Sequence, residues 1–148
     1  MGMIAQTIQL ALAPVFVLVA IGSIMNLLSN RLGRVVDRSR ELQALHPETD
    51  GAEHDMIVRE IRMLDHRIRL INLAILLMVL SGLAIGCVVV ILFAQEFFQT
   101  DLQIPAGGVF IVGIGLLMGA LVLFLKETRI AAMALRIPAS FLELDRKL

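Results

Sequence analysis

Residues 70–95 read LINLAILLMVLSGLAIGCVVVILFAQ, an uncharged and almost wholly apolar run. An α-helix needs about 20 such residues to cross a hydrocarbon core. Two more uncharged runs of sufficient length occupy residues 1–30 and 102–125, and 58% of the 148 residues are hydrophobic. A spanning barrel needs many alternating ten-residue strands, which this chain does not have room for. We therefore predict an all-α integral membrane protein with three transmembrane helices.

The basic residues predict how these spans are oriented. All 13 Lys and Arg residues fall within residues 31–40, 59–69 and 126–147. The segment between the second and third spans carries only the acidic Glu96 and Asp101. Basic residues are retained in the cytoplasm. We expect the N-terminus outside, the C-terminus inside, and a multi-pass protein of a bacterial inner (plasma) membrane. The N-terminal run lacks the basic leader of a cleavable signal, so we expect it to stay as a span.

The length of the chain favours a single membrane domain, residues 1–148. We expect six parts: spans at about 4–28, 72–94 and 105–125, a cytoplasmic hairpin at 29–71, an outer loop at 95–104 and a cytoplasmic tail at 126–148.

Two helical seams predict that the first two spans continue into the cytoplasm as an antiparallel hairpin. Apolar residues recur at alternating steps of four and three, the spacing of helices that pack along a seam. The seam residues are Leu28, Leu32, Val35, Ser39 and Leu42, then Ile57, Ile61, Leu64, Ile68 and Ile71. Between them, His46-Pro47 should end the first helix.

Other local signals concern helix ends. Pro14 should kink or loosen the first helix. Asp50 followed by Glu53 predicts a capping box for the second, and Pro105 suits the first turn of the third. Pro138 should interrupt that helix before a short amphipathic tail that carries Phe141, Leu144 and Leu148.

Four segments of the sequence together resemble a known family. They are residues 12–16 (LAPVF), 21–22 (IG), 30–42 (NRLGRVVDRSREL) and 124–129 (FLKETR). The chain is thereby similar to the bacterial inner-membrane family Domain of Unknown Function 2721, with residues 30–42 the most specific part. The resemblance implies an inner-membrane location and a three-helix membrane fold, and it implies no activity.

One face of the first helix is a candidate pore lining. Steps of three and four residues place small or polar side chains, two bulky apolar ones and three arginines on one narrow face. The residues are Gln6, Gln9, Ala13, Phe16, Ala20, Ser23, Leu27, Arg31, Arg34 and Arg38. In a ring of subunits, Phe16 and Leu27 would constrict the pore and the arginines would form a basic cytoplasmic mouth. The alternative is that small residues mark close helix packing.

Glycine pairs give a second packing signal. Gly82 and Gly86 in the second span, and Gly115 and Gly119 in the third, have the small-xxx-small spacing that lets helix backbones approach closely. The approach can lie within one subunit or between subunits. Because three spans enclose little by themselves, we expect a homo-oligomer.

The sequence carries no sign of catalysis. No Asp, Glu, Lys, Arg or His lies within any predicted span, which argues against an ion-coupled transporter. Cys87 has no nearby His, and nucleophile-elbow, HExxH and P-loop motifs are absent. His46, His54 and the acidic residues around them lack the spacing of a metal site. We expect no enzyme activity, no cofactor and no bound metal.

The basic clusters suggest lipid contact. Acidic neighbours at helical spacing, such as Asp37 for Arg34 and Asp65 for Arg67, should neutralise much of the charge locally. Arginines near the bilayer would meet anionic headgroups. The net charge is zero and the chain has no binding motif, so we expect no nucleic-acid partner.

Two functions remain open. One is a homo-oligomeric passive pore or channel-like assembly lined by the first helix. The other is a non-conducting scaffold or sensor whose cytoplasmic hairpin docks a protein partner.

Overall fold

The computed structural model describes residues 2–134, and these form three long α-helices and one 3-10 turn. Each α-helix is long and apolar enough to cross a membrane, so the predicted fold class of an all-helical protein with three candidate spans is confirmed. The predicted amphipathic tail after Pro138 lies outside the described residues. The elements are α1 (Gly2–Leu45), η1 (His46–Glu48), α2 (Gly51–Phe98) and α3 (Gln103–Ala134).

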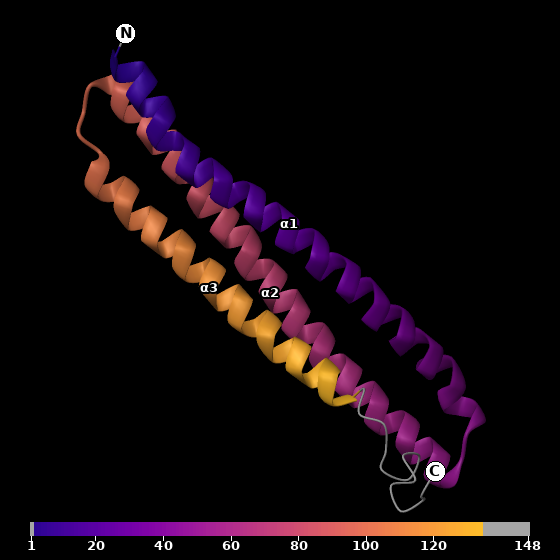
Figure 1. Cartoon of the computed structure of the whole chain (residues 1–148). Helices are drawn as coiled ribbons and strands as arrows, with labels where there is room; N and C mark the ends of the chain where they lie inside the picture. The colour runs from indigo at the N-terminus through magenta and orange to yellow at the C-terminus, as the bar shows by residue number, and fades with distance from the viewer. Residues whose placement is uncertain (1, 135–148) are drawn as a thin grey trace, which may run out of the picture.

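The helix α2 is the centre of the fold. It packs against α1 on one side and α3 on the other, whereas α1 and α3 hardly contact each other (Figure 1). Successive helices run in opposite directions, so the start of α1 lies beside the α2–α3 loop. At the other end, α1 and α2 continue together past the end of α3 to the turn at η1. The structure is therefore three helices thick at one end and two at the other.

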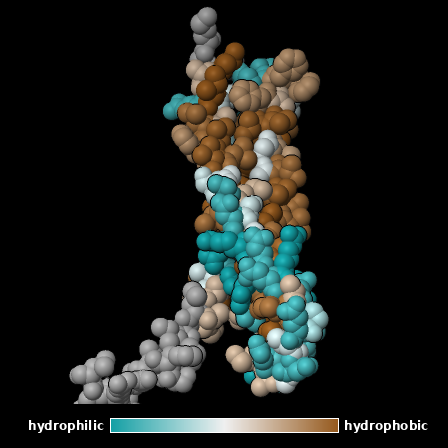
Figure 2. All heavy atoms as spheres, turned by 90° about the vertical axis from the view of Figure 1, so that its right-hand side faces the viewer, coloured by the Kyte–Doolittle hydropathy of each residue, from teal (hydrophilic) through white to brown (hydrophobic). Residues whose placement is uncertain are grey.

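Polarity changes along this rod. Figure 2 shows apolar side chains over much of the half that contains the N-terminus, and polar ones over much of the half that contains the η1 turn. Large apolar side chains in the first half are exposed, among them Val19, Leu83, Ile111 and Val122. Exposed apolar surface of this extent requires lipid or protein around it.

The seam between α1 and α2 repeats every seventh residue. Both predicted sets of seam residues are buried or half-buried, and the buried repeat continues into the apolar half of the rod. A strict seven-residue repeat keeps one face of each helix toward its partner over many turns. The buried residues of this repeat are Ile21, Leu28, Val35 and Leu42 of α1, and Ile57, Leu64, Ile71, Met78 and Ile85 of α2.

A second seam, between α2 and α3, uses small residues. The buried residues of α3 are Ala106, Gly113, Ala120 and Glu127, again at every seventh position. Small side chains let the helices approach closely. The Ser81 hydroxyl of α2, fully buried, donates a hydrogen bond of 2.7 Å to the Gly113 carbonyl. This bond satisfies a polar side chain in a region where water is unavailable.

The two predicted glycine pairs account for only part of the close approach between the helices. A Cβ at Gly119 would lie 3.4 Å from Leu77, and one at Gly82 would lie 3.9 Å from Ile21, both ordinary contacts. A Cβ at Gly86 or Gly115 would meet nothing within 4 Å among the described residues. The tightest glycine is Gly113, which belongs to neither predicted pair.

The ends of the helices differ in two details from the sequence-based expectations. The outer loop is shorter than 95–104, because α2 continues to Phe98, Gln99 caps it in a left-handed conformation, and α3 begins at Gln103. The Gln95 side chain accepts a hydrogen bond from the Leu102 N–H, which keeps the loop tight.

The expected capping box at the start of α2 is absent. Asp50 is the N-cap residue but makes no capping hydrogen bond. The next residue, Gly51, has φ +66°, a left-handed backbone that separates Asp50 from the free N–H groups of the helix. As predicted, α1 ends before His46-Pro47. Pro14 lies inside α1, which stays helical through it, and the expected kink stays a prediction.

We predict that Gly113→Leu lowers the free energy of unfolding by about 3 kcal/mol, since overpacking a tight contact costs up to about this much. An added Cβ would lie 2.8 Å from Ile85 Cδ1 and 3.3 Å from Ala84 Cβ. Gly115→Leu is the matched control, because it adds the same side chain where there is space. Thermal unfolding in detergent measures both; equal losses would contradict this packing.

Candidate functional site

Three charged side chains meet where the apolar part of the bundle ends. The carboxylate of Glu127 in α3 is fully buried, with an exposed fraction of 0%. Its Oε2 lies 2.9 Å from Arg31 Nη2 of α1, and its Oε1 lies 2.9 Å from Arg67 Nη2 and 3.0 Å from Arg67 Nε of α2. We call this group the Arg31–Glu127–Arg67 clamp, because it joins all three helices.

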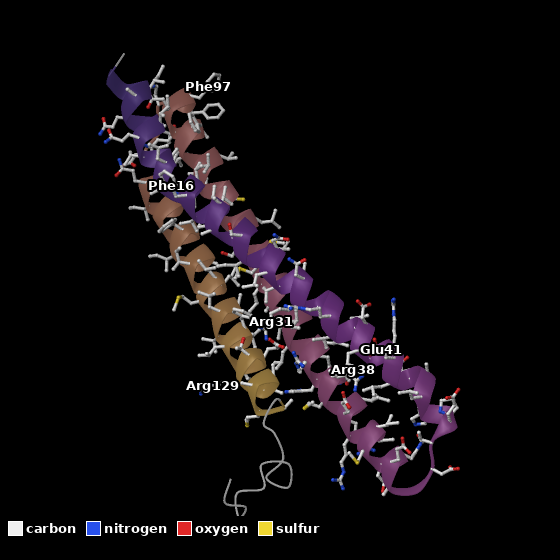
Figure 3. The ribbon with its side chains drawn as sticks, turned by 45° about the vertical axis from the view of Figure 1, so that its right-hand side comes forward. Phe16, Arg31, Arg38, Glu41, Phe97 and Arg129 are labelled. Atoms are coloured by element: carbon white, nitrogen blue, oxygen red, sulfur yellow. The ribbon has the colours of Figure 1, made fainter. Side chains whose placement is uncertain are left out.

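Each residue of the clamp reaches this place for a structural reason. Glu127 occupies the α3 seam position that follows Ala106, Gly113 and Ala120. Arg67 occupies the corresponding position on α2, seven residues before the buried Ala74. Arg31 reaches across from α1, and its guanidinium lies 5.3 Å from the centre of the Phe124 ring, a cation–π contact (Figure 3).

The electrostatics of the clamp are unbalanced. A buried carboxylate is tolerable when charged donors surround it, and here two guanidinium groups do so. The two arginines carry one positive charge more than Glu127 compensates. Both arginines are mostly buried, with exposed fractions of 21% for Arg31 and 16% for Arg67. The clamp therefore leaves a net positive charge at the junction of the helices.

Beside the clamp lies a groove of about 660 Å³ between α1, α2 and the end of α3. We call it the arginine groove, since four arginines line it. Its remaining lining is one acidic and five apolar side chains. The lining residues are Arg31, Arg34, Val35, Arg38, Glu60, Met63, Leu64, Arg67, Ala131 and Ala134.

Arg38, further along α1 (Figure 3), has its charge compensated at the rim of the groove. It donates a hydrogen bond of 2.9 Å to Glu60 and one of 3.3 Å to Glu41. The hydrogen bond to Glu60 makes the largest contribution and the one to Glu41 the next largest. Together they raise the pKa of Arg38 above its usual value, so this arginine stays charged.

Two other donors of the groove lack partners. The buried Nε of Arg31 has no hydrogen-bond acceptor among the described residues. Arg34 is exposed, and it forms no ion pair with any residue from 2 to 134. Of the two, only Arg34 is open to a ligand in the groove, because the Nε of Arg31 has almost no exposed surface.

The sequence-based prediction of which carboxylates neutralise the arginines is wrong for Arg67 and Arg34. Arg67 pairs with Glu127 of α3 rather than with Asp65, which instead lies 2.8 Å from Arg69. Arg34 forms no ion pair with Asp37 in the structure. The reason is that α3 supplies a buried carboxylate, which attracts a guanidinium more strongly than an exposed neighbour does.

No other part of the chain that the structure describes covers the candidate pore lining on α1. Except for Arg31, which is half-buried, every residue of that face is exposed: Gln6, Gln9, Ala13, Phe16, Ala20, Ser23, Leu27, Arg34 and Arg38. The side chain of Phe16 is 68% exposed and that of Leu27 45%. Close packing of this face against α2 or α3 is therefore excluded as the reason for its small residues.

The η1 turn brings its two histidines together. The rings of His46 and His54 lie 4.4 Å apart, and His54 Nδ1 is 3.5 Å from the Thr49 hydroxyl. Within residues 2–134, no three His, Cys, Asp or Glu side chains converge as metal ligands would.

Sequence reasoning did not find Glu127, Ser81 or Gly113. A signal for Glu127 was present, because Ala106, Gly113, Ala120 and Glu127 form one seven-residue series in which three small residues precede an acid. That series points the acid toward the neighbouring helix.

These features define a class of protein. Three long apolar helices, with one buried carboxylate joining them at the end of the apolar region, are those of a small multi-pass membrane protein. The chain belongs to the family described as "Protein of unknown function (DUF2721)", which it matches over residues 11–137. This match confirms the resemblance drawn from residues 30–42. Comparisons with curated proteins and with solved structures find no match.

We predict that Glu127→Gln lowers the free energy of unfolding by about 3 kcal/mol, because breaking a buried pair leaves uncompensated charge. Asp65→Asn, which removes an exposed carboxylate paired with Arg69, should cause no measurable change. Thermal unfolding in detergent at fixed lipid content compares them. A Glu127→Gln protein as stable as the wild type would show that the clamp does not hold the helices together.

Proposed function

We propose that this protein lies in a bacterial inner membrane with its N-terminus outside and its C-terminus in the cytoplasm. The basic residues support this orientation, because they begin at Arg31 on α1 and the α2–α3 loop has none. Figure 2 shows an apolar half and a polar half of the rod. In the proposed orientation, the boundary between these halves lies at the level of the cytoplasmic headgroups. The parts of α1 and α2 beyond α3 are then a cytoplasmic antiparallel hairpin.

We further propose that copies of the chain assemble as a homo-oligomeric passive pore or channel-like assembly lined by α1. The observation that carries this proposal is the uncovered polar face of α1. Gln6, Gln9 and Ser23 of this face are exposed, although most other side chains of this part of the helix are apolar. Exposed amide groups are unfavourable in hydrocarbon, so this face favours water or a second copy of the chain.

In such an assembly the side chains along the α1 face would change from apolar within the span to basic at its cytoplasmic end. Phe16 and Leu27 would form apolar constrictions, which close a pore by excluding water. Arg34 and Arg38 would lie at the cytoplasmic mouth, while Arg31 is held by Glu127 and contributes less to it. The proposed function is conduction without catalysis, and it calls for no cofactor or metal.

A second candidate is a non-conducting scaffold or sensor that docks a cytoplasmic protein. The observation that favours it is the length of α1 and α2 beyond α3, which extends the polar end of the rod (Figure 1). Exposed apolar side chains near the turn, Leu45 at 44% and Met56 at 71%, offer contacts for a partner.

We predict that purified protein in liposomes conducts ions, and that Phe16→Ala or Leu27→Ala raises the flux several-fold because each removes a constriction. Both side chains are exposed, so neither change disturbs the core of one subunit. The measurement is dye- or electrode-detected ion flux.

The matched controls are Ile111→Ala and Val122→Ala, which truncate exposed apolar residues of α3. They should leave the flux unchanged. A monomeric mass in detergent, or no flux from any of the five proteins, would overturn the pore proposal and leave the scaffold role.

The orientation has its own test. In a Cys87→Ser background, a membrane-impermeant maleimide should label Thr100→Cys in intact cells and Asp50→Cys only after lysis, since both positions are exposed at opposite ends of the rod. The reverse pattern would contradict the proposed orientation, and it would do so whether or not the protein conducts.

A further inference from the structure

The arginine groove has the charge of an anion site. Its lining carries four guanidinium groups and one carboxylate, Glu60, and the buried Glu127 lies behind it. Glu60 is already engaged by Arg38, and Glu127 by Arg31 and Arg67. A positive surplus therefore remains on the groove, and a ligand that completes it should carry negative charge.

The free donors also indicate which kind of anion fits. Arg34 has no ion pair within residues 2–134, and the buried Nε of Arg31 has no acceptor there. Planar guanidinium groups match the oxygens of a phosphate or carboxylate bidentately. A phosphate group has enough oxygens to accept from two arginines at once. This match favours a tetrahedral oxyanion over a single halide ion.

The walls of the groove suggest that the anion is part of a larger molecule. Val35, Met63, Leu64, Ala131 and Ala134 form its apolar side. At about 660 Å³ the groove is in the size range of sites for small organic ligands and exceeds what a bare ion needs. The groove thus combines a charged end with an apolar wall, as an ester of phosphate requires.

We propose that the arginine groove binds an anionic phosphate ester, with the exposed Arg34, unpaired within residues 2–134, as the principal donor. The groove lies at the end of the apolar half of the bundle, on the level where the proposed orientation places cytoplasmic headgroups. The phosphate ester can therefore be the headgroup of an anionic phospholipid or a soluble phosphomonoester. The proposal does not depend on the pore, because one chain forms the whole groove.

Arg34→Gln is the decisive variant, with Arg40→Gln as its matched control. Both are exposed arginines of α1 without an ion pair among the described residues, but only Arg34 lines the groove. Full-length protein in detergent is titrated with phosphatidylglycerol or phosphatidylcholine of the same chains by native mass spectrometry. It is titrated separately with glycerol 3-phosphate and inorganic phosphate by calorimetry.

We expect Arg34→Gln to weaken binding of the preferred phosphate ligand about tenfold, as loss of one charge-assisted contact does, and Arg40→Gln to leave it unchanged. Preference for phosphatidylglycerol without competition by glycerol 3-phosphate identifies the lipid as the source. Binding of glycerol 3-phosphate to lipid-free protein identifies a soluble ester. Equal effects of the two variants, or binding of neither kind of phosphate, would overturn the proposal. Unchanged thermal unfolding of both variants confirms that the fold is intact.

Discussion

The fold depends on one buried carboxylate. The helices α1 and α3 hardly contact each other, and Glu127 is the residue through which Arg31 of α1 and Arg67 of α2 are both tied to α3. A carboxylate without exposed surface is strongly unfavourable unless charged donors compensate it. Because the two arginines come from different helices, compensation requires all three helices to meet at this level. The clamp therefore joins all three helices at the level where the apolar part of the bundle ends.

Between the clamp and the end of the rod that contains the N-terminus, α2 packs against α1 along one seam and against α3 along another. Toward α1 it presents large apolar residues such as Ile71 and Met78, and toward α3 it presents Ala74 and Ser81. Small residues allow a close approach, and the Ser81–Gly113 hydrogen bond fixes its register in a region without water. Because α2 lies between α1 and α3, the outer face of α1 is exposed within residues 2–134, and this exposure is the basis for proposing assembly through that face.

Below the clamp, the same charges shape the arginine groove. Arg31 and Arg67 bind Glu127 and also line the groove, so the ion pairs hold the groove walls in place. Two positive charges against one negative leave a surplus, and Arg34 adds to it from the surface. The clamp and the groove are thus two sides of one electrostatic arrangement. The residues that stabilise the bundle therefore also line its positively charged groove.

The sequence by itself determined the class of the protein: three apolar runs, their boundaries at charged clusters, the seven-residue seams from Leu28 to Ile71, and the family. These are local or periodic properties, and hydropathy and helical geometry are enough to derive them. Only the tertiary structure decided that Arg67 pairs with Glu127 of α3 and not with the neighbouring Asp65. It also decided that the close helix contact lies at Gly113 and not at Gly115. Finally, it left Arg34 without an ion pair within residues 2–134. Such choices depend on which residues meet across helices, and spacing along one helix does not contain that information.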